Sequence, residues 1–267
     1  NSGVFQFSAM LGPVIAGFLM HQLDVIWPVY LCCAIGCLTF AASATLLHPR
    51  ETERKSSGVT LKGMFAGADH VWREKTILST ITLDLFAVLL GGATALLPMY
   101  ARDILAVGPR GLGMLKAAPY VGAFVMSLLL AHRPPFKKAG RALLWSVALF
   151  GATTIVFGLS TSFILSLVML FVGGAVDNIS VVIRHVLVQV RTPDHLRGRM
   201  TSVSMIFFMG GPQLGEVEAG YVAKAFGPVF SVVSGGAACM AACAAIAWGT
   251  PDLWRFRRGD DEPAKAA

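Results

Sequence analysis

Long apolar runs dominate the hydrophobic pattern of this 267-residue chain. A helix needs about 20 predominantly apolar residues to cross a bilayer, and a sliding-window reading finds eight runs of about that length. Short polar segments separate the runs, which is the pattern of a polytopic α-helical membrane protein. The expected spans cover residues 3–21, 25–47, 77–100, 112–132, 142–161, 163–188, 201–223 and 227–249.

The composition agrees with a membrane protein. Hydrophobic residues make up 55% of the chain and charged residues 14%, whereas a soluble domain carries about 25% charged residues. The mean hydropathy is +0.67. So few polar groups cannot cover so many apolar ones in water, so we predict an all-α membrane fold.

Basic residues gather on one side of the predicted membrane. Of the 22 Lys and Arg, 18 lie in the C-terminal tail or near the connections that follow the even-numbered spans, and 4 lie on the other side. This bias places residues 48–76 and the tail 251–267 in the cytoplasm. It also explains the net charge of +7 as membrane-side anchors, so we expect no nucleic-acid partner. Within the long loop, Leu61 to Trp72 has the spacing of an amphipathic surface helix.

A short repeat predicts a duplicated six-helix unit. Residues 11–17 and 214–220 both read L-G-x-x-x-A-G, and parallel repeats of this kind occur in transporters; chance is the alternative, because Gly and Ala are common in membrane helices. A duplication would make the chain helices 5 to 12 of twelve, with helices 1 to 4 before Asn1. We therefore expect two helices of an N-terminal bundle in 1–47, a linker in 48–76, a C-terminal bundle in 77–250 and a tail in 251–267.

Four stretches of the chain look familiar: Leu83–Pro98 with Ala101–Asp103, Gly174–Arg184, Thr192–Arg199 and Leu214–Glu216. They resemble the major facilitator superfamily, and within it the bacterial branch of the enterobactin exporter and related secretion effectors. Residues 11–17 resemble the Gly-Pro motif of the fifth helix in the family's antiporters. The loop His132–Arg141 is a degraded form of the family's gating motif and lacks its usual Asp. The resemblance implies a facilitator fold and alternating access between two bundles.

Charged residues inside the predicted spans are the candidate transport groups, because a charge at the bilayer centre is costly. A buried carboxylate that gains and loses a proton suits proton coupling. Structural networks between helices, or helix ends that reach the membrane surface, are the alternative explanation. The resemblance implies that their helices line the cavity or the seam between the bundles. The candidates are Asp84, Asp177, Arg184, Glu216 and Glu218.

Small residues predict a close helix seam. Gly211, Gly215 and Ala219 recur every four residues, and Gly12 and Ala16 do the same, beside Pro13 and Gly17. Such stripes allow a neighbouring helix to approach closely. The resemblance implies that this helix pair forms the sliding seam between the bundles; static packing is the alternative.

The sequence therefore predicts a secondary transporter of the bacterial inner membrane, with a cytoplasmic C-terminus. We expect export of small amphipathic or siderophore-like molecules coupled to protons; a lipid flippase, an importer, or a sensor or scaffold without transport are the alternatives. An enzyme is disfavoured, because no nucleophile–base set or metal-ligand pair lies within a span. We expect no cofactor and no metal, since the five cysteines lie in apolar runs without zinc-ligand spacing. The partners are the lipid bilayer, a small substrate, protons and helices 1 to 4.

Overall fold

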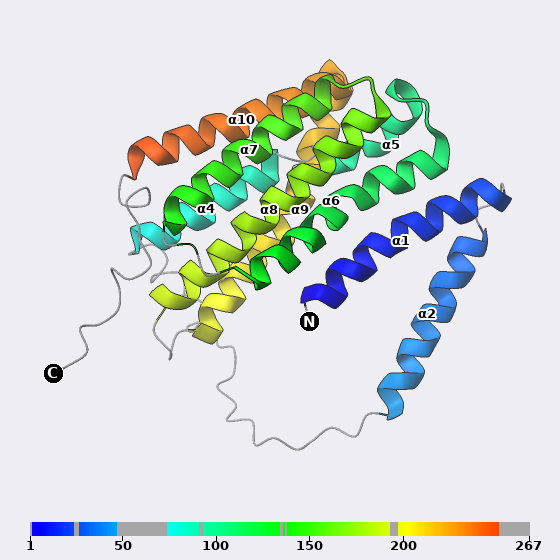
Figure 1. Ribbon diagram of the computed structural model, residues 1–267, viewed down its shortest axis with the longest axis horizontal. Helices are drawn as coiled ribbons and strands as arrows, with labels where there is room; N and C mark the ends of the chain where they lie inside the picture. Colours follow the sequence, from blue (N-terminus) through cyan, green and yellow to red (C-terminus); the bar gives the residue numbers. More distant parts are fainter. Residues whose placement is uncertain are drawn as a thin grey trace.

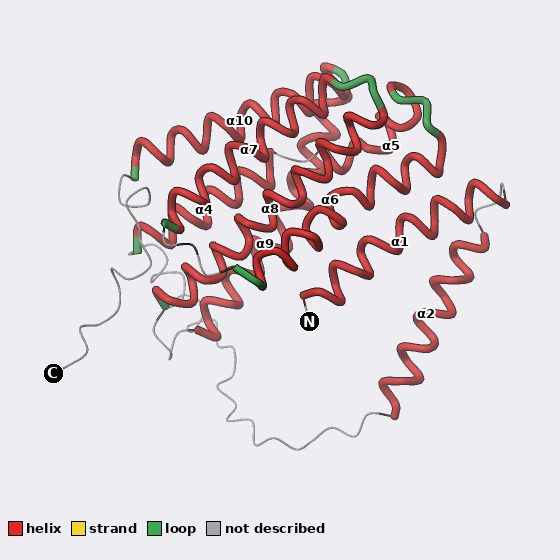
Figure 2. The backbone as a smooth tube through the Cα atoms, viewed as in Figure 1, coloured by secondary structure: helices red, strands yellow, loops and turns green. Residues whose placement is uncertain are grey.

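The computed structural model describes residues 2–23, 27–46, 74–90, 93–133, 136, 138–192 and 197–250. These ranges contain helices joined by short loops and turns, and no strand (Figure 2). The predicted amphipathic helix of the long loop and the C-terminal tail lie outside the described residues. The helices are α1 Ser2–Leu23, α2 Trp27–Leu46, α4 Lys75–Leu90, α5 Leu97–Met99, α6 Gly108–Ala131, α7 Ala139–Leu159, α8 Phe163–Arg191, α9 Arg197–Phe226 and α10 Pro228–Gly249.

Six long helices, α4 and α6 to α10, form a bundle (Figure 1). Within it α6 packs on α8, α7 packs on both α8 and α10, and α9 packs on α4 and α10. Helix α1 lies along the outer side of α6 and runs antiparallel to it, and α2 diverges from α1 toward the linker. None of the side chains of α2 is buried, so its apolar surface is available to lipid or to other helices.

Five of the expected spans are long and apolar enough to cross a membrane, judged over the described residues. They are α2, α6, α7, α10 and residues Phe163–Val188 of α8. Helices α1 and α4 contribute shorter apolar stretches, Phe7–Leu23 and Leu78–Ala87. The expected span 201–223 lies inside α9, which is helical but does not meet the same criterion. The chain is thus a multi-spanning helical protein, while the count of eight spans stays a prediction.

The expected span 77–100 is not one continuous α-helix. Helix α4 ends at Leu90, and a 3₁₀ turn at Ala93–Leu96, the short α5 and a π turn at Tyr100–Ile104 follow. Pro98 contributes to this irregularity, because proline has no N–H to donate to the preceding turn. The irregular segment brings Tyr100 into the bundle, where its ring is fully buried and its hydroxyl donates a hydrogen bond to the Gly158 carbonyl at 2.9 Å.

Two apolar clusters occupy the bundle at different depths. The first cluster joins α4, α7, α8 and α10, and the second joins the irregular segment to α6, α7, α8, α9 and α10. Helix α8 contributes Leu170 to the second cluster and Ile183 to the first. These positions are 13 residues apart, about 20 Å along the helix axis. The middle of α8 therefore lies between two packed apolar layers.

Glycines set the closest helix contacts. A Cβ built at Gly151 of α7 would lie 2.9 Å from the Gly236 carbonyl oxygen of α10, and one built at Gly236 would lie 2.9 Å from the Gly151 oxygen. Where α6 crosses α8, Gly122 meets the backbone of Phe171 and Gly174 meets the backbone of Pro119. Backbones approach this closely only where no side chain intervenes, as in other small-residue helix contacts.

Candidate functional site

The middle of α8 carries the polar residues that mark the candidate site. Asn178 and Ser180 are buried, whereas Asp177 and Arg184 are half-buried. Asp177 comes seven residues after Leu170 of one apolar cluster and six before Ile183 of the other. Its carboxylate thus lies at the level between the two clusters, near the centre of the bundle.

Asp177 lies within electrostatic range of a thiol on α10. Its carboxylate is close enough to Cys239 to interact electrostatically with that thiol. Within the part of the chain that the structure describes, the carboxylate makes no hydrogen bond and no ion pair. A carboxylate placed among apolar helices without such partners is energetically costly, so Asp177 stays a candidate transport group.

The neighbouring residue anchors α8 to α6. Ser127 donates a hydrogen bond from Oγ to Asn178 Oδ1 at 3.1 Å. The bond joins the two helices a short distance from their glycine contacts at Gly122 and Gly174. Sequence reasoning missed Ser127. Nothing in the sequence pairs the two, because a serine in a membrane helix most often bonds its own backbone.

Arg184 shares the Asp177 face of α8. Seven residues separate them, which is two helical turns or about 10 Å along the axis. The guanidinium therefore cannot neutralise the Asp177 carboxylate directly along the helix. The two residues place opposite charges at different depths of one polar face.

The structure does not bring the other predicted carboxylates into contact with Asp177. Glu216 and Glu218 are both exposed on α9, about 200° apart around the helix. In the described ranges neither forms a hydrogen bond or ion pair with Asp177. The side chain of Asp84 lies outside the described side chains, although its backbone belongs to α4.

The α9 stripe lies inside the C-terminal bundle. Gly211, Gly215 and Ala219 are buried, and Ala223 extends the same row. The helix packs mainly on α4, α10 and the 3₁₀ turn, and Ser231 of α10 donates a hydrogen bond to the Ala219 carbonyl at 3.0 Å. The principal contacts of the stripe are therefore with helices of its own bundle.

The small residues of α1 pack on a different helix, and the residues in closest contact are not those expected from the Gly12–Ala16 spacing. Gly12 is exposed, and a Cβ built there would meet no atom within 4 Å. Gly17 is buried instead, and a Cβ there would lie 2.9 Å from the Pro109 oxygen and 3.1 Å from Gly113 Cα of α6. A Cβ at Gly113 would lie 2.6 Å from the Pro13 oxygen. Pro13 and Gly17 are the close-contact residues, and the principal neighbour of α1 is α6 rather than α9.

The chain matches the model of the Major Facilitator Superfamily over residues 1–216. The chain belongs to the major facilitator superfamily. It is thus a multi-pass membrane protein of a transporter family, not an enzyme. The match includes the irregular segment after α4, the glycine contacts of α6 and the polar stretch of α8.

A curated relative is the multidrug efflux pump Tap of Mycolicibacterium fortuitum. The two sequences are 26% identical over 230 residues, which cover 84% of this chain and 56% of the relative. The chain therefore spans little more than half the length of that pump. The likeness extends to α6 and α8, the two helices that the Ser127–Asn178 bond joins.

Proposed function

We propose that this superfamily member is part of a proton-coupled exporter of small amphipathic or siderophore-like molecules. The observation that carries the proposal is the position of Asp177, half-buried between two apolar clusters and without a hydrogen bond or ion pair in the described structure. The efflux activity named for the relative supports export. The enterobactin-exporter resemblance of Gly174–Arg184 supports the substrate class.

A proton on Asp177 gives the coupling a physical basis. An ionised carboxylate at the bilayer centre costs about 2.5–3.5 kcal/mol on insertion scales, and protonation removes that charge. The protonated form therefore favours the conformation in which the bundles enclose Asp177, and the ionised form favours one in which it faces water. A ligand that can bind only one of these conformations shifts the same equilibrium, so substrate and proton become linked.

The test is proton-driven efflux by the full-length protein, with any segment that precedes Asn1, in proteoliposomes that carry an imposed pH gradient. Asp177→Asn keeps the shape of the side chain but cannot exchange the proton, so we expect substrate to equilibrate without accumulating against its gradient. Asp103→Asn is the matched control. Asp103 is exposed and lies 3.3 Å from Arg102 Nε outside the bundle core, so its loss leaves coupling intact.

Glu216→Gln tests the second carboxylate in the same assay. Glu216 is exposed on α9, and loss of coupling in this variant alone would transfer the proton site from α8 to α9. Coupling that persists in both variants would remove both residues from the mechanism. Accumulation of substrate in the opposite direction would indicate an importer. Lipid movement without solute flux would indicate a flippase, and the absence of any flux would indicate a sensor or scaffold.

For the architecture we propose twelve helices, of which this chain supplies helices 5 to 12. Residues 1–47 would close the N-terminal bundle, 48–76 link the halves, 77–250 form the C-terminal bundle, and 251–267 form a cytoplasmic tail at the bacterial inner membrane. The L-G-x-x-x-A-G repeat supports this proposal. Four further apolar spans before Asn1 are the expected observation, and a polar domain there would contradict it.

A further inference from the structure

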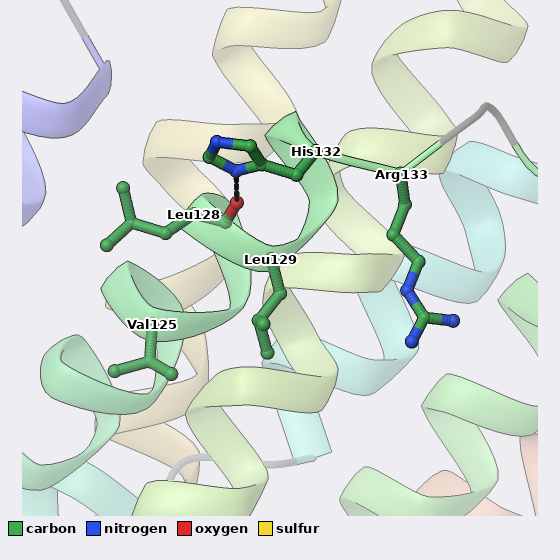
Figure 3. Close-up of a pocket in the computed structure, with 5 residues that line it drawn as sticks. All are labelled: Val125, Leu128, Leu129, His132 and Arg133. Atoms are coloured by element: carbon green, nitrogen blue, oxygen red, sulfur yellow. Dashed lines mark hydrogen bonds between the residues drawn. The ribbon is translucent and has the colours of Figure 1, made fainter.

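A pocket of about 410 Å³ lies at the C-terminal end of α6. It falls within the size range of small-ligand sites, about 300–1,000 Å³. Figure 3 shows Leu128 and Leu129 on the turn before His132 and Val125 one turn earlier, with Arg133 leaving the end of the helix on the side away from the His132 ring. The lining residues are Val125, Leu128, Leu129, His132 and Arg133.

The pocket has an apolar part and a cationic part. Val125, Leu128 and Leu129 are 38%, 51% and 55% exposed, so they offer contact area to an occupant. Among the lining residues that the structure describes there is no Asp or Glu. Within the described structure, the Arg133 guanidinium makes no hydrogen bond or ion pair. Its charge is therefore available to an anion.

His132 closes the helix end beside the arginine. Its Nδ1 donates a hydrogen bond to the Leu128 carbonyl at 2.9 Å (Figure 3), since a carbonyl oxygen can only accept. The bond satisfies one of the last four carbonyl groups of the helix, which have no partner within it. It holds the ring at the rim of the pocket, on the other side of the helix end from the Arg133 side chain (Figure 3).

The apolar and cationic parts of the pocket lie at different depths in the membrane. Helix α6 has 24 residues, about 36 Å of helix, which exceeds the hydrocarbon core of about 30 Å. Val125 and His132 are seven residues apart, or about 10 Å along the axis. The aliphatic residues therefore lie at the depth of acyl chains, and the two basic residues lie at the depth of lipid phosphates. The basic bias of the connections places this end on the cytoplasmic side.

We infer that this pocket binds an anionic phospholipid of the cytoplasmic leaflet. One acyl chain lies against Val125, Leu128 and Leu129, and the lipid phosphate pairs with Arg133. Arginine suits this role because its planar guanidinium donates two hydrogen bonds to one phosphate. Basic pockets at the cytoplasmic ends of membrane helices bind anionic head groups in this way. The site does not depend on proton coupling or on the identity of the exported molecule.

Lipid binding by the full-length protein tests the inference. The protein is purified in a mild detergent and titrated with dioleoyl phosphatidylglycerol or dioleoyl phosphatidylcholine, and native mass spectrometry counts the bound lipids. We expect one saturable phosphatidylglycerol that phosphatidylcholine does not replace. Arg133→Ala weakens this binding roughly fivefold, the effect of one basic residue at an anionic lipid surface.

Arg110→Ala is the matched control, because Arg110 is an exposed arginine at the other end of the same helix. This variant keeps the wild-type affinity. Arg133→Lys retains the charge and loses less binding than Arg133→Ala. If Arg133→Ala is not monodisperse on gel filtration, Arg133→Gln takes its place.

Two ligand arms separate a lipid site from a phosphate site or a simple surface charge. Dihexanoyl phosphatidylglycerol binds more weakly than the long-chain lipid if the aliphatic residues contribute, and inorganic phosphate does not compete. If Arg133→Ala and Arg110→Ala bind phosphatidylglycerol with equal affinity, the inference is overturned. A wild-type protein without preference for phosphatidylglycerol would also overturn it, and that result is expected if a segment before Asn1 covers the pocket.

Discussion

Gly113→Ala probes the contact between α1 and α6. The added Cβ would lie 2.6 Å from the Pro13 carbonyl oxygen and 3.2 Å from Gly17 Cα. Both neighbours are backbone atoms, so no side chain can rotate away. To reach an ordinary contact of 3.4 Å, the helices must separate locally by about 0.8 Å. The substitution therefore loosens the packing of α1 along α6.

A second glycine supplies the reference state. Gly12 lies on α1, and a Cβ there would meet no atom within 4 Å. Gly→Ala in a helix interior gains up to about 1 kcal/mol from helix propensity, and this gain is common to both variants. Overpacking costs typically about 1–3 kcal/mol and applies to Gly113→Ala alone. The difference between the two variants isolates the steric term.

Thermal unfolding of the full-length protein in detergent measures this difference. At about 2–4 °C per kcal/mol for a chain of this size, Gly113→Ala should melt roughly 2–12 °C below Gly12→Ala. Gly17→Ala should lie between them, because its closest backbone contact is 2.9 Å rather than 2.6 Å. A Gly113→Ala protein that melts with or above Gly12→Ala would refute the close packing of α1 on α6.

Two further variants test hydrogen bonds within the bundle. Ser127→Ala removes the 3.1 Å bond to Asn178 and should lower the free energy of unfolding by about 0.6 kcal/mol, up to about 1.7. Ser146→Ala is the control, because it removes only a bond within α7. An equal loss of stability in both variants would show that the bond between α6 and α8 adds no stability of its own. Tyr100→Phe leaves the Gly158 carbonyl without the 2.9 Å hydroxyl donor and should cost about 1–3 kcal/mol. Tyr120→Phe, at a ring 38% exposed, is the matched control in the same melting assay, and indistinguishable melts would contradict the buried role of Tyr100.

The sequence predicted the helices well because hydropathy acts on each segment separately. Helices α2, α7 and α10 follow from apolar runs of membrane length, and the structure reproduces their extents closely. The irregular segment after α4 was not predicted as such. Which turns replace the helix near Pro98 depends on where Tyr100 finds space and a hydrogen-bond partner.

Helix pairing and the surroundings of the site could not be derived in the same way. Small residues occur on α1, α6 and α9 alike, so a stripe shows that a close neighbour is possible without identifying it. The predicted seam residues of α1 included Gly12, Pro13 and Gly17, and only the contacts with α6 show that Pro13 and Gly17 make the close approach there. Asp177 was identified because an isolated charge stands out in an apolar helix, whereas Ser127 and Cys239 resemble ordinary helix residues until the fold places them near it.

The two glycine contacts of α6 fall on opposite sides of one helix. Gly113 faces α1 and Gly122 faces α8, and nine residues at 100° each place them about 180° apart. Helix α6 is therefore a thin wall between the other two, with backbone against backbone on both sides. Such surfaces lack protruding side chains that interlock, so they resist separation more than lengthwise displacement. Shear along α6 is thus easier for α1 than for α8, which the Ser127–Asn178 hydrogen bond also holds.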